Sequence, residues 1–327
     1  MVDWNDPKNI ERLNNIFFSY VQKETSRIEQ NNIRFVHYTS ADTGLKILRN
    51  NKVWLRNAIV MNDFSEVHHG ERCVAEAWQD DTVGGRLKTL LNSWEAGLDI
   101  KVADAYDEFQ HDRGTKTFIF SMSEHGDHDT NEDKYGRLSM WRAYGGDTNV
   151  AFIFKSEPFL APSDALNAFI SPVIYKSPED FKPIFFEFIQ KLEEEREFIG
   201  TLPIEAIIDN ICRVFYFAAL STKHPGFAEE KEWRVIHSPT LMPSTVLKAS
   251  TEVIAGVPQE VYKIPFQNFP DQGLEGATIP ELLDRIIIGP TQYSQTIYDA
   301  FVSEPERFKG VSDPSSRVII SDIPLRR

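Results

Sequence analysis

Apolar side chains recur every three to four residues over residues 7–29, a spacing that predicts an amphipathic helix at the start of the chain. Residues 67–113 are mainly helix-like and charged, and Trp78 and Trp94 are the expected packing anchors. We therefore expect an N-terminal helix over residues 1–30, followed by a helical excursion at about residues 64–112.

A second pair of helical patterns lies near the middle of the chain. Residues 179–199 and 203–222 each place large apolar side chains on one helical face. Gly200 and Pro203 separate the two patterns, which favours an antiparallel helical hairpin. The pair is expected to be a lobe inserted at about residues 179–222 in one α+β domain that covers residues 31–327.

Short apolar runs rich in β-branched and aromatic residues predict strands. They cover residues 34–36, 53–56, 117–121, 149–154, 171–175, 232–237, 261–264, 285–288 and 317–320. Ser40 is suited to cap a short helix that carries Asp42 in its first turn, and a further helix is expected over residues 291–302. Residues 124–134, dense in Asp, His, Gly and Asn, read as a solvated loop. Helices between early strands, with strands clustered late, predict a mixed α+β fold.

The net charge and the cysteine content limit the binding partners and the cellular compartment that we expect for the protein. The chain has 35 Lys and Arg against 49 Asp and Glu, a formal charge of −14, which argues against an extended nucleic-acid surface but permits a local basic pocket. Its two cysteines form no paired motif, which indicates a reducing cytoplasm. No apolar run approaches the ~20 residues of a membrane helix, so no membrane partner is expected.

The turn formed by His37, Tyr38, Thr39 and Ser40 joins a predicted strand to a predicted helix. Its imidazole, phenol and hydroxyls lie beside free helix N–H groups, where a nucleotide's sugar and phosphates could dock. The alternative is a capped turn in which His37 bonds a backbone carbonyl.

Two carboxylates, Glu230 and Glu232, are two residues apart and would leave one face of an extended strand. Burying them in an apolar strand is costly unless partners satisfy them, so they mark either a site or a salt-bridged edge. Arg234 shares that face and is the obvious ion-pair partner of Glu232.

Trp141 and Tyr144, three residues apart on a short helical segment with Arg142, are expected on one helical face. Core packing is one interpretation, and a stacking wall for an aromatic ring is the other.

Two histidine clusters, His68 with His69 and His125 with His128, lack organised ligand spacing. We expect these four residues at the surface and no bound metal. Cys73 has neighbouring histidines but no clear third member of a catalytic triad, so the pattern does not favour a cysteine hydrolase.

Four ordered pieces of the chain resemble a bacterial family labelled domain of unknown function 2971. The pieces are the His37 to Ser40 turn with residues 47–55, Met61-Asn62-Asp63-Phe64-Ser65-Glu66, Phe120-Ser121 leading to residues 140–145, and residues 230–234 with residues 286–290. They span about residues 34–290, and the family label implies no activity.

A looser resemblance is to the ADP-ribosyltransferase superfamily, whose layout has a strand ending in His-x-Thr and a late strand bearing a glutamate. It implies a largely antiparallel sheet and NAD as co-substrate. His37 and Thr39 would hold the NAD ribose, Trp141 or Tyr144 would stack on nicotinamide, and Glu232, with Glu230 as substitute, would be catalytic. The chain departs from that layout because no clear second-motif tyrosine is present.

The resemblance implies a binding set that completes these roles, with Arg56 or Arg142 neutralising the pyrophosphate. The set comprises His37, Tyr38, Thr39, Ser40, Arg56, Asn62, Ser121, Trp141, Arg142 and Tyr144. A carboxylate near the ribose would stabilise the positive charge that builds as the nicotinamide bond breaks.

Three functional hypotheses follow. The first is an NAD-consuming ADP-ribosyltransferase or glycohydrolase, with a toxin or anti-phage effector as its setting and a protein or nucleic acid as acceptor. The second is a non-catalytic nucleotide or second-messenger sensor that uses the same pocket. The third is a metal-dependent nuclease built on Asp63, Glu66 and the acidic strand.

Overall fold

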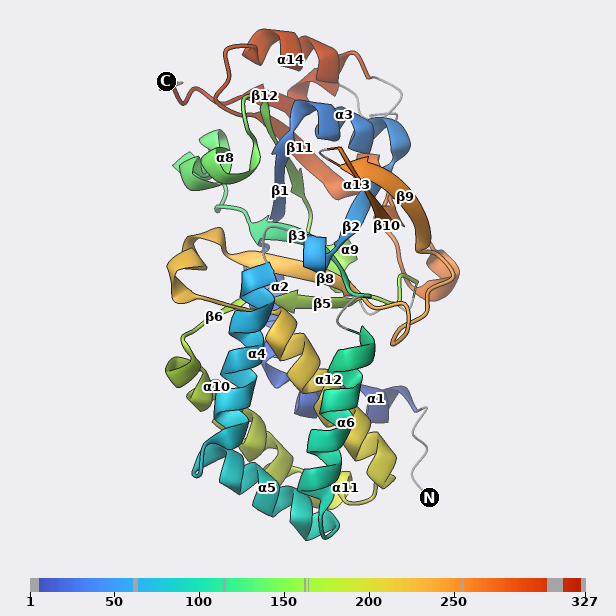
Figure 1. Cartoon of the computed structure of the whole chain (residues 1–327). Coiled ribbons are helices and arrows are strands. Elements are labelled where there is room, and N and C mark those ends of the chain that lie inside the picture. The colour runs from blue at the N-terminus through green and yellow to red at the C-terminus, as the bar shows by residue number, and fades with distance from the viewer. Residues whose placement is uncertain are drawn as a thin grey trace. The chain divides into compact units, whose positions relative to one another are not determined.

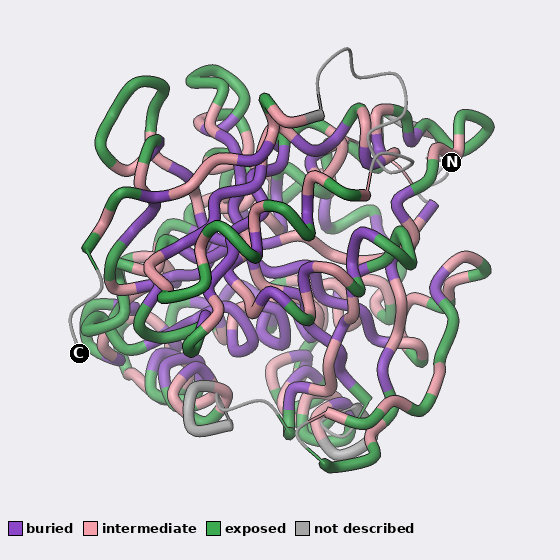
Figure 2. The backbone as a smooth tube through the Cα atoms, turned by 90° about the horizontal axis from the view of Figure 1, so that it is seen from above, coloured by how far each residue is buried: buried purple, intermediate pink, exposed green. Residues whose placement is uncertain are grey.

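The computed structural model describes residues 6–60, 64–113, 116–161, 163, 165–254, 256–304 and 314–324. The chain divides into two compact units, each assembled from separate stretches of sequence. The helical unit comprises residues 1–26, 58–117 and 171–228, and the sheet unit comprises residues 27–57, 118–170 and 229–327. Figure 2 shows the buried backbone segments in purple and the exposed loops in green.

The sheet unit is organised on a largely antiparallel sheet (Figure 1), so the chain is α+β, as predicted. Its main path has the strand order β12-β11-β4-β1-β3-β2-β10-β9, and only the β11–β12 pair is parallel. Two further strands leave this path, because β8 pairs with β3 and β5 pairs with β8. The strands are β1 (Phe35–Ser40), β2 (Lys52–Asn57), β3 (Phe118–Glu124), β4 (Asn149–Phe154), β5 (Phe169–Pro172), β8 (Glu232–His237), β9 (Lys248–Ile254), β10 (Val257–Pro265), β11 (Leu283–Ile288) and β12 (Val318–Ile320).

β3 is the strand at which the sheet forks. β8 pairs along one edge of β3, from Phe118 to Ser123. β1 and β2 therefore share the other edge, with β1 at Ser123 and Glu124 and β2 at Phe118 and Ile119. The fork places β8 along one edge of β3, and β1 and β2 at opposite ends of the other edge.

The two faces of this sheet bury different side chains. We call the face that carries Phe35, His37 and Phe120 the A face, and the face that carries Val36 and Tyr38 the B face. The large core of the A face includes α3 (Ala41–Asn50) and α14 (Ser294–Val302), and α8 (Leu138–Tyr144) contributes to the smaller core of the B face. The shorter helices of the unit are α7 (Asn131–Tyr135), α9 (Glu157–Leu160) and α13 (Ile279–Leu282).

The helical unit has α12 (Ile204–Leu220) at its centre, packed against α4 (Phe64–Gln79) and α6 (Leu98–Arg113), as Figure 1 shows. The Phe185 ring of α10 (Pro178–Glu194) stacks on Phe215 of α12, with 5.6 Å between ring centroids. The remaining elements are α1 (Pro7–Phe17), most of α2 (Ser19–Gln30), α5 (Val83–Trp94), α11 (Arg196–Ile199), and the paired strands β6 (Ile174–Tyr175) and β7 (Thr222–Lys223).

Several local predictions are corrected by the structure. The N-terminal helix is two helices, because the backbone leaves helical geometry at Phe18. The predicted loop at residues 124–134 contains α7, and His125 and Asp133 within it are buried. The ion pair between Arg34 and Asp133, 2.6 Å long, draws this segment inward. β9 was not predicted because it is largely exposed and lacks an apolar run.

The Ser40 cap of α3 is confirmed, since its Oγ accepts a hydrogen bond from the Thr43 backbone N–H at 3.3 Å. We expect Ser40→Ala to lower the free energy of unfolding by about 1 kcal/mol, because the first turn loses its acceptor. Ser40→Thr keeps the acceptor and should stay close to wild type in urea denaturation. An equal loss in both variants would contradict a capping role.

Candidate functional site

His37 lies on β1 and makes the backbone contact that the sequence left open as an alternative. Its Nδ1 is 3.0 Å from the Ser121 carbonyl oxygen, and its ring is 4.8 Å from the Phe120 ring. Burial lowers the pKa of His37 to about 4, so the ring is neutral near pH 7. A carbonyl only accepts, so Nδ1 carries the proton and donates it. The imidazole thus takes the place of a strand-to-strand backbone bond where β1 and β3 diverge.

The sheet register separates His37 from Glu232. Val36 pairs with Ser123, and Ser123 pairs with Glu232, so these three side chains leave the sheet on one face. His37 follows Val36 on the same strand and leaves on the opposite face. His37 therefore belongs to the A face and Glu232 to the B face, and they do not form one constellation across a pocket.

A polar cluster lies instead on the B face of β2, β3 and β8. Ser121 pairs directly with Arg234, and Arg56 of β2 pairs with Ile119, the neighbour of Ser121 on that face. Glu232 and Arg234 are only 6% and 3% exposed. Arg234 Nε donates to Glu232 Oε1 at 2.9 Å, and Nη2 donates to Oε2 at 3.2 Å. The predicted ion pair is therefore present, and it is buried.

The Ser121 hydroxyl is the group in this cluster that is available to bind a ligand. Its Oγ is buried and has no hydrogen-bond partner among the described residues. A buried hydroxyl normally has a partner, so an unpaired one marks a place where a polar ligand atom could bind. The pairing with Arg234 sets a cation beside it.

Tyr38 also lies on the B face, although its side chain is committed to the core. Its hydroxyl accepts a 2.8 Å hydrogen bond from the Arg137 backbone N–H, and its ring meets the Trp141 ring edge-on. Burial raises the pKa of Tyr38 to about 12. Thr39 lies on the A face with His37, paired with Val150, and Ser40 caps α3.

Trp141 is a core residue. It is 2% exposed, and its Nε1 donates to the Tyr135 carbonyl at 2.9 Å. A Cβ atom at Gly136 or Gly289 would lie within 2.6 or 2.7 Å of the indole ring, so only glycine leaves room for it. The packing interpretation of Trp141 thus accounts for its environment, and the ring offers little surface on which a ligand could stack.

Tyr144 and Arg142 extend from the same helix to the surface. Tyr144 is 45% exposed, and its hydroxyl donates to Glu230 Oε1 at 2.8 Å. Arg142 is exposed. The structure thus brings Tyr144 together with Glu230, a pair that the sequence did not predict.

Glu230 does not share a strand face with Glu232, contrary to the prediction. It ends a 3₁₀ segment, Pro225–Glu230, and β8 begins only at Glu232. Lys231 between them has a φ of 45°, which breaks the alternation of an extended strand. Arg137, which the sequence did not single out, fixes this junction by donating from Nη1 to the carbonyls of Glu229 and Glu230. No pattern in the sequence signals that contact, because the partners are backbone atoms distant in the chain.

Other candidates are placed as follows. Asn62 and Asp63 lie outside the described residues, and no side chain of Glu66 is described. Among the residues that are described, no three His, Cys, Asp or Glu side chains gather to hold a metal. His128 is exposed, whereas the expectation of a surface position is wrong for His125.

Cys73 is not an activated nucleophile in this structure. Its Sγ is 3.7 Å from His69 Nε2, but the residue is fully buried and burial raises the pKa of the thiol to about 11. A catalytic cysteine needs a lowered pKa.

One comparison with known families is informative. Residues 140–235 match the model of a family described as a protein of unknown function, DUF2971. The matched segment runs from α8 to β8 and contains Trp141, Tyr144, Glu230 and Glu232. It is narrower than the 34–290 span of the quoted motifs. No curated protein and no solved structure matches the chain.

The matched segment includes α10 and α12, the two long helices of residues 178–220. Neither they nor any other helix within the described ranges combines the length and the apolar character that crossing a membrane requires.

Proposed function

We propose that the sheet unit binds a phosphorylated nucleotide of the NAD type on its B face, at β2, β3 and β8. The observation that supports this proposal is the cluster of Arg56, Ser121, Glu232 and Arg234 on one face of three neighbouring strands, in which Glu232, Arg234 and the Ser121 hydroxyl are buried. Guanidinium groups bind phosphate oxygens, and a carboxylate with a hydroxyl can bond the paired hydroxyls of a ribose.

Cleavage of the NAD glycosidic bond is the second candidate, and the buried Glu232 carboxylate favours it. Bond breaking places positive charge on the ribose, and a fixed carboxylate close to that charge stabilises the transition state. Arg234 bonds both carboxylate oxygens, so Glu232 is suited to electrostatic stabilisation and not to proton transfer. The same proposal includes an ADP-ribosyltransferase-like arrangement of the sheet unit. In that arrangement Tyr38, and not His37, lies on the same face of the sheet as the Glu232 carboxylate.

The test compares binding with turnover. NAD binding is measured by calorimetry and nicotinamide release by chromatography, with and without cell extract as a source of acceptor. Ser121→Ala should weaken NAD binding roughly fivefold to tenfold, the effect of about 1 kcal/mol from one hydrogen bond. Glu232→Gln should abolish nicotinamide release if the protein is an enzyme, and a sensor would bind NAD without releasing nicotinamide.

His37→Gln is the control from the opposite face. It should bind NAD as wild type does, because His37 projects away from the cluster. Loss of binding in His37→Gln with retained binding in Ser121→Ala would overturn the B-face site, and absence of NAD binding to the wild type would overturn the choice of nucleotide. The nuclease hypothesis stays a separate prediction, tested by chelator-sensitive cleavage of nucleic acid.

A further inference from the structure

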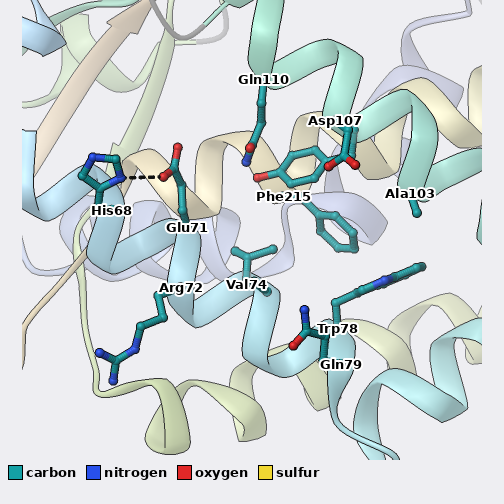
Figure 3. A pocket seen from close by; sticks show the side chains of 12 residues that line it. His68, Glu71, Arg72, Val74, Trp78, Gln79, Ala103, Asp107, Gln110 and Phe215 are labelled. Atoms are coloured by element: carbon teal, nitrogen blue, oxygen red, sulfur yellow. Dashed lines mark hydrogen bonds and ion pairs between the residues drawn. The ribbon is translucent and has the colours of Figure 1, made fainter.

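The helical unit contains a pocket of about 480 Å³ between α4 and α6, with α12 at its base (Figure 3). This volume lies within the range of small-molecule sites in proteins. Figure 3 shows side chains from α4 and α6 directed towards the space between these helices. All of the lining residues belong to the helical unit, so this pocket is distinct from the B-face cluster.

Aromatic rings make the apolar wall of the pocket. Trp78 and Tyr106 each meet the Phe215 ring edge-on, with centroid distances of 5.7 and 5.5 Å. The Trp78 indole already accepts a cation, because Lys88 Nζ lies 5.0 Å from its centroid. A flat aromatic ligand would gain both apolar burial and favourable ring contacts against this wall.

One polar group inside the wall lacks a partner. The Tyr106 hydroxyl is buried and makes no hydrogen bond of good geometry to any described residue. Burial raises the pKa of Tyr106, and the nearby Gln110 amide opposes that rise only in part. A ligand with a polar edge could supply the missing partner, since buried hydroxyls are normally hydrogen-bonded.

The charges at the pocket favour a cation. Three of the lining residues are held in ion pairs, His68 with Glu71 at 3.0 Å and Arg72 with Glu76 at 2.9 Å. Asp107 also lines the pocket, and no hydrogen bond or ion pair joins it to another described residue. The charge available to a ligand is therefore a carboxylate.

We propose that this pocket binds a planar aromatic amine, with its ring against Trp78 and Phe215 and its ammonium group near Asp107. The ligand class combines the three features of the pocket: an aromatic wall, an unpaired hydroxyl and an unpaired carboxylate. The site is independent of nucleotide binding at the B face.

The experiment uses tryptamine as the probe and indole-3-acetate as its anionic counterpart, with the full-length protein in a calorimeter. Tryptamine should bind, and indole-3-acetate should bind at least tenfold more weakly. Asp107→Asn should weaken tryptamine binding roughly tenfold, as expected for a lost charged hydrogen bond. Ala75→Leu, a change at an exposed lining position of α4, should also weaken binding by filling part of the pocket.

Asp104→Asn is the matched control, because it removes the same charge one turn away on α6 at an exposed position that does not line the pocket. It should leave tryptamine binding unchanged. Equal affinity of wild type and Asp107→Asn, equal affinity for the two probes, or no binding of tryptamine at low millimolar concentration would each overturn the proposal.

Discussion

Acidification from pH 6.5 to pH 4 is expected to destabilise the protein by about 3 kcal/mol for each of two histidines with a strongly lowered pKa, the half-buried His37 and the buried His125. Burial is the main cause that lowers the pKa of both from 6.5 to about 4. Between these values the unfolded chain binds protons that the folded chain does not, so stability rises with pH across this window. The difference between a pKa of 6.5 in the unfolded chain and one of about 4 in the folded chain corresponds to about 3 kcal/mol.

Buried carboxylates change the stability in a lower pH range than the histidines do, so the two contributions can be measured separately. The arginines near Asp133 and Asp284 hold the pKa of both carboxyls below its usual value despite their burial. The stability that they contribute is present above the ordinary carboxyl pKa of about 4 and is lost as the pH falls further. Loss of stability between pH 6.5 and 4 therefore reports mainly on the histidines.

Urea denaturation at several pH values from 4 to 7.5 provides the measurement. His37→Gln and His125→Gln should each flatten the pH dependence of the free energy of unfolding. His68→Gln is the control, because His68 is exposed on α4. A flat wild-type profile, or an equal slope in His37→Gln and His68→Gln, would contradict the assignment.

The second large effect is expected at Arg234. Arg234→Met keeps an apolar stem but removes the guanidinium group that bonds both oxygens of the buried Glu232 carboxylate. Removing one member of a buried ion pair typically costs 3–5 kcal/mol of stability, with the cost arising from the uncompensated charge. We expect a loss in that range, about 4 kcal/mol, at pH 7.

The double variant Arg234→Met/Glu232→Gln separates this cause from lost packing. It should recover much of the stability, because the buried carboxylate charge is removed together with the guanidinium that balanced it. Arg72→Ala breaks the exposed pair with Glu76, whose side chains are 66% and 45% exposed, and should cost no more than about 1 kcal/mol. A loss at Arg234 as small as that at Arg72 would show that the pair is not buried in solution.

Features that depend on neighbouring residues were predictable from the sequence. The Ser40 cap and the strand after it follow from local hydrogen bonding and apolar runs. The Glu232 and Arg234 pair was also foreseen, because side chains two residues apart in a strand share a face.

Features that depend on distant partners were not predictable. The sequence around His125 and Asp133 resembles a solvated loop. The partner that draws Asp133 into the interior is Arg34, which lies 99 residues earlier in the chain and therefore leaves no local signal. The placement of His37 opposite Glu232 depends on the register of β1 and β8 with β3, and a shift of one residue would have reversed it. Positive φ at Lys231, which displaced Glu230 from the strand, has no signal in the residue type.

The interleaving of the two units has a consequence for the order in which the chain folds during synthesis. The helical unit takes its last segment from residues 171–228, so α4 and α6 must wait for α12 to leave the ribosome. The sheet unit can complete its fold only later, because β8, which pairs with the central strand β3, is synthesised after α12. Nascent chains stalled before residue 228 should therefore expose the apolar faces of α4 and α6, and chaperones that bind such surfaces would act on them first.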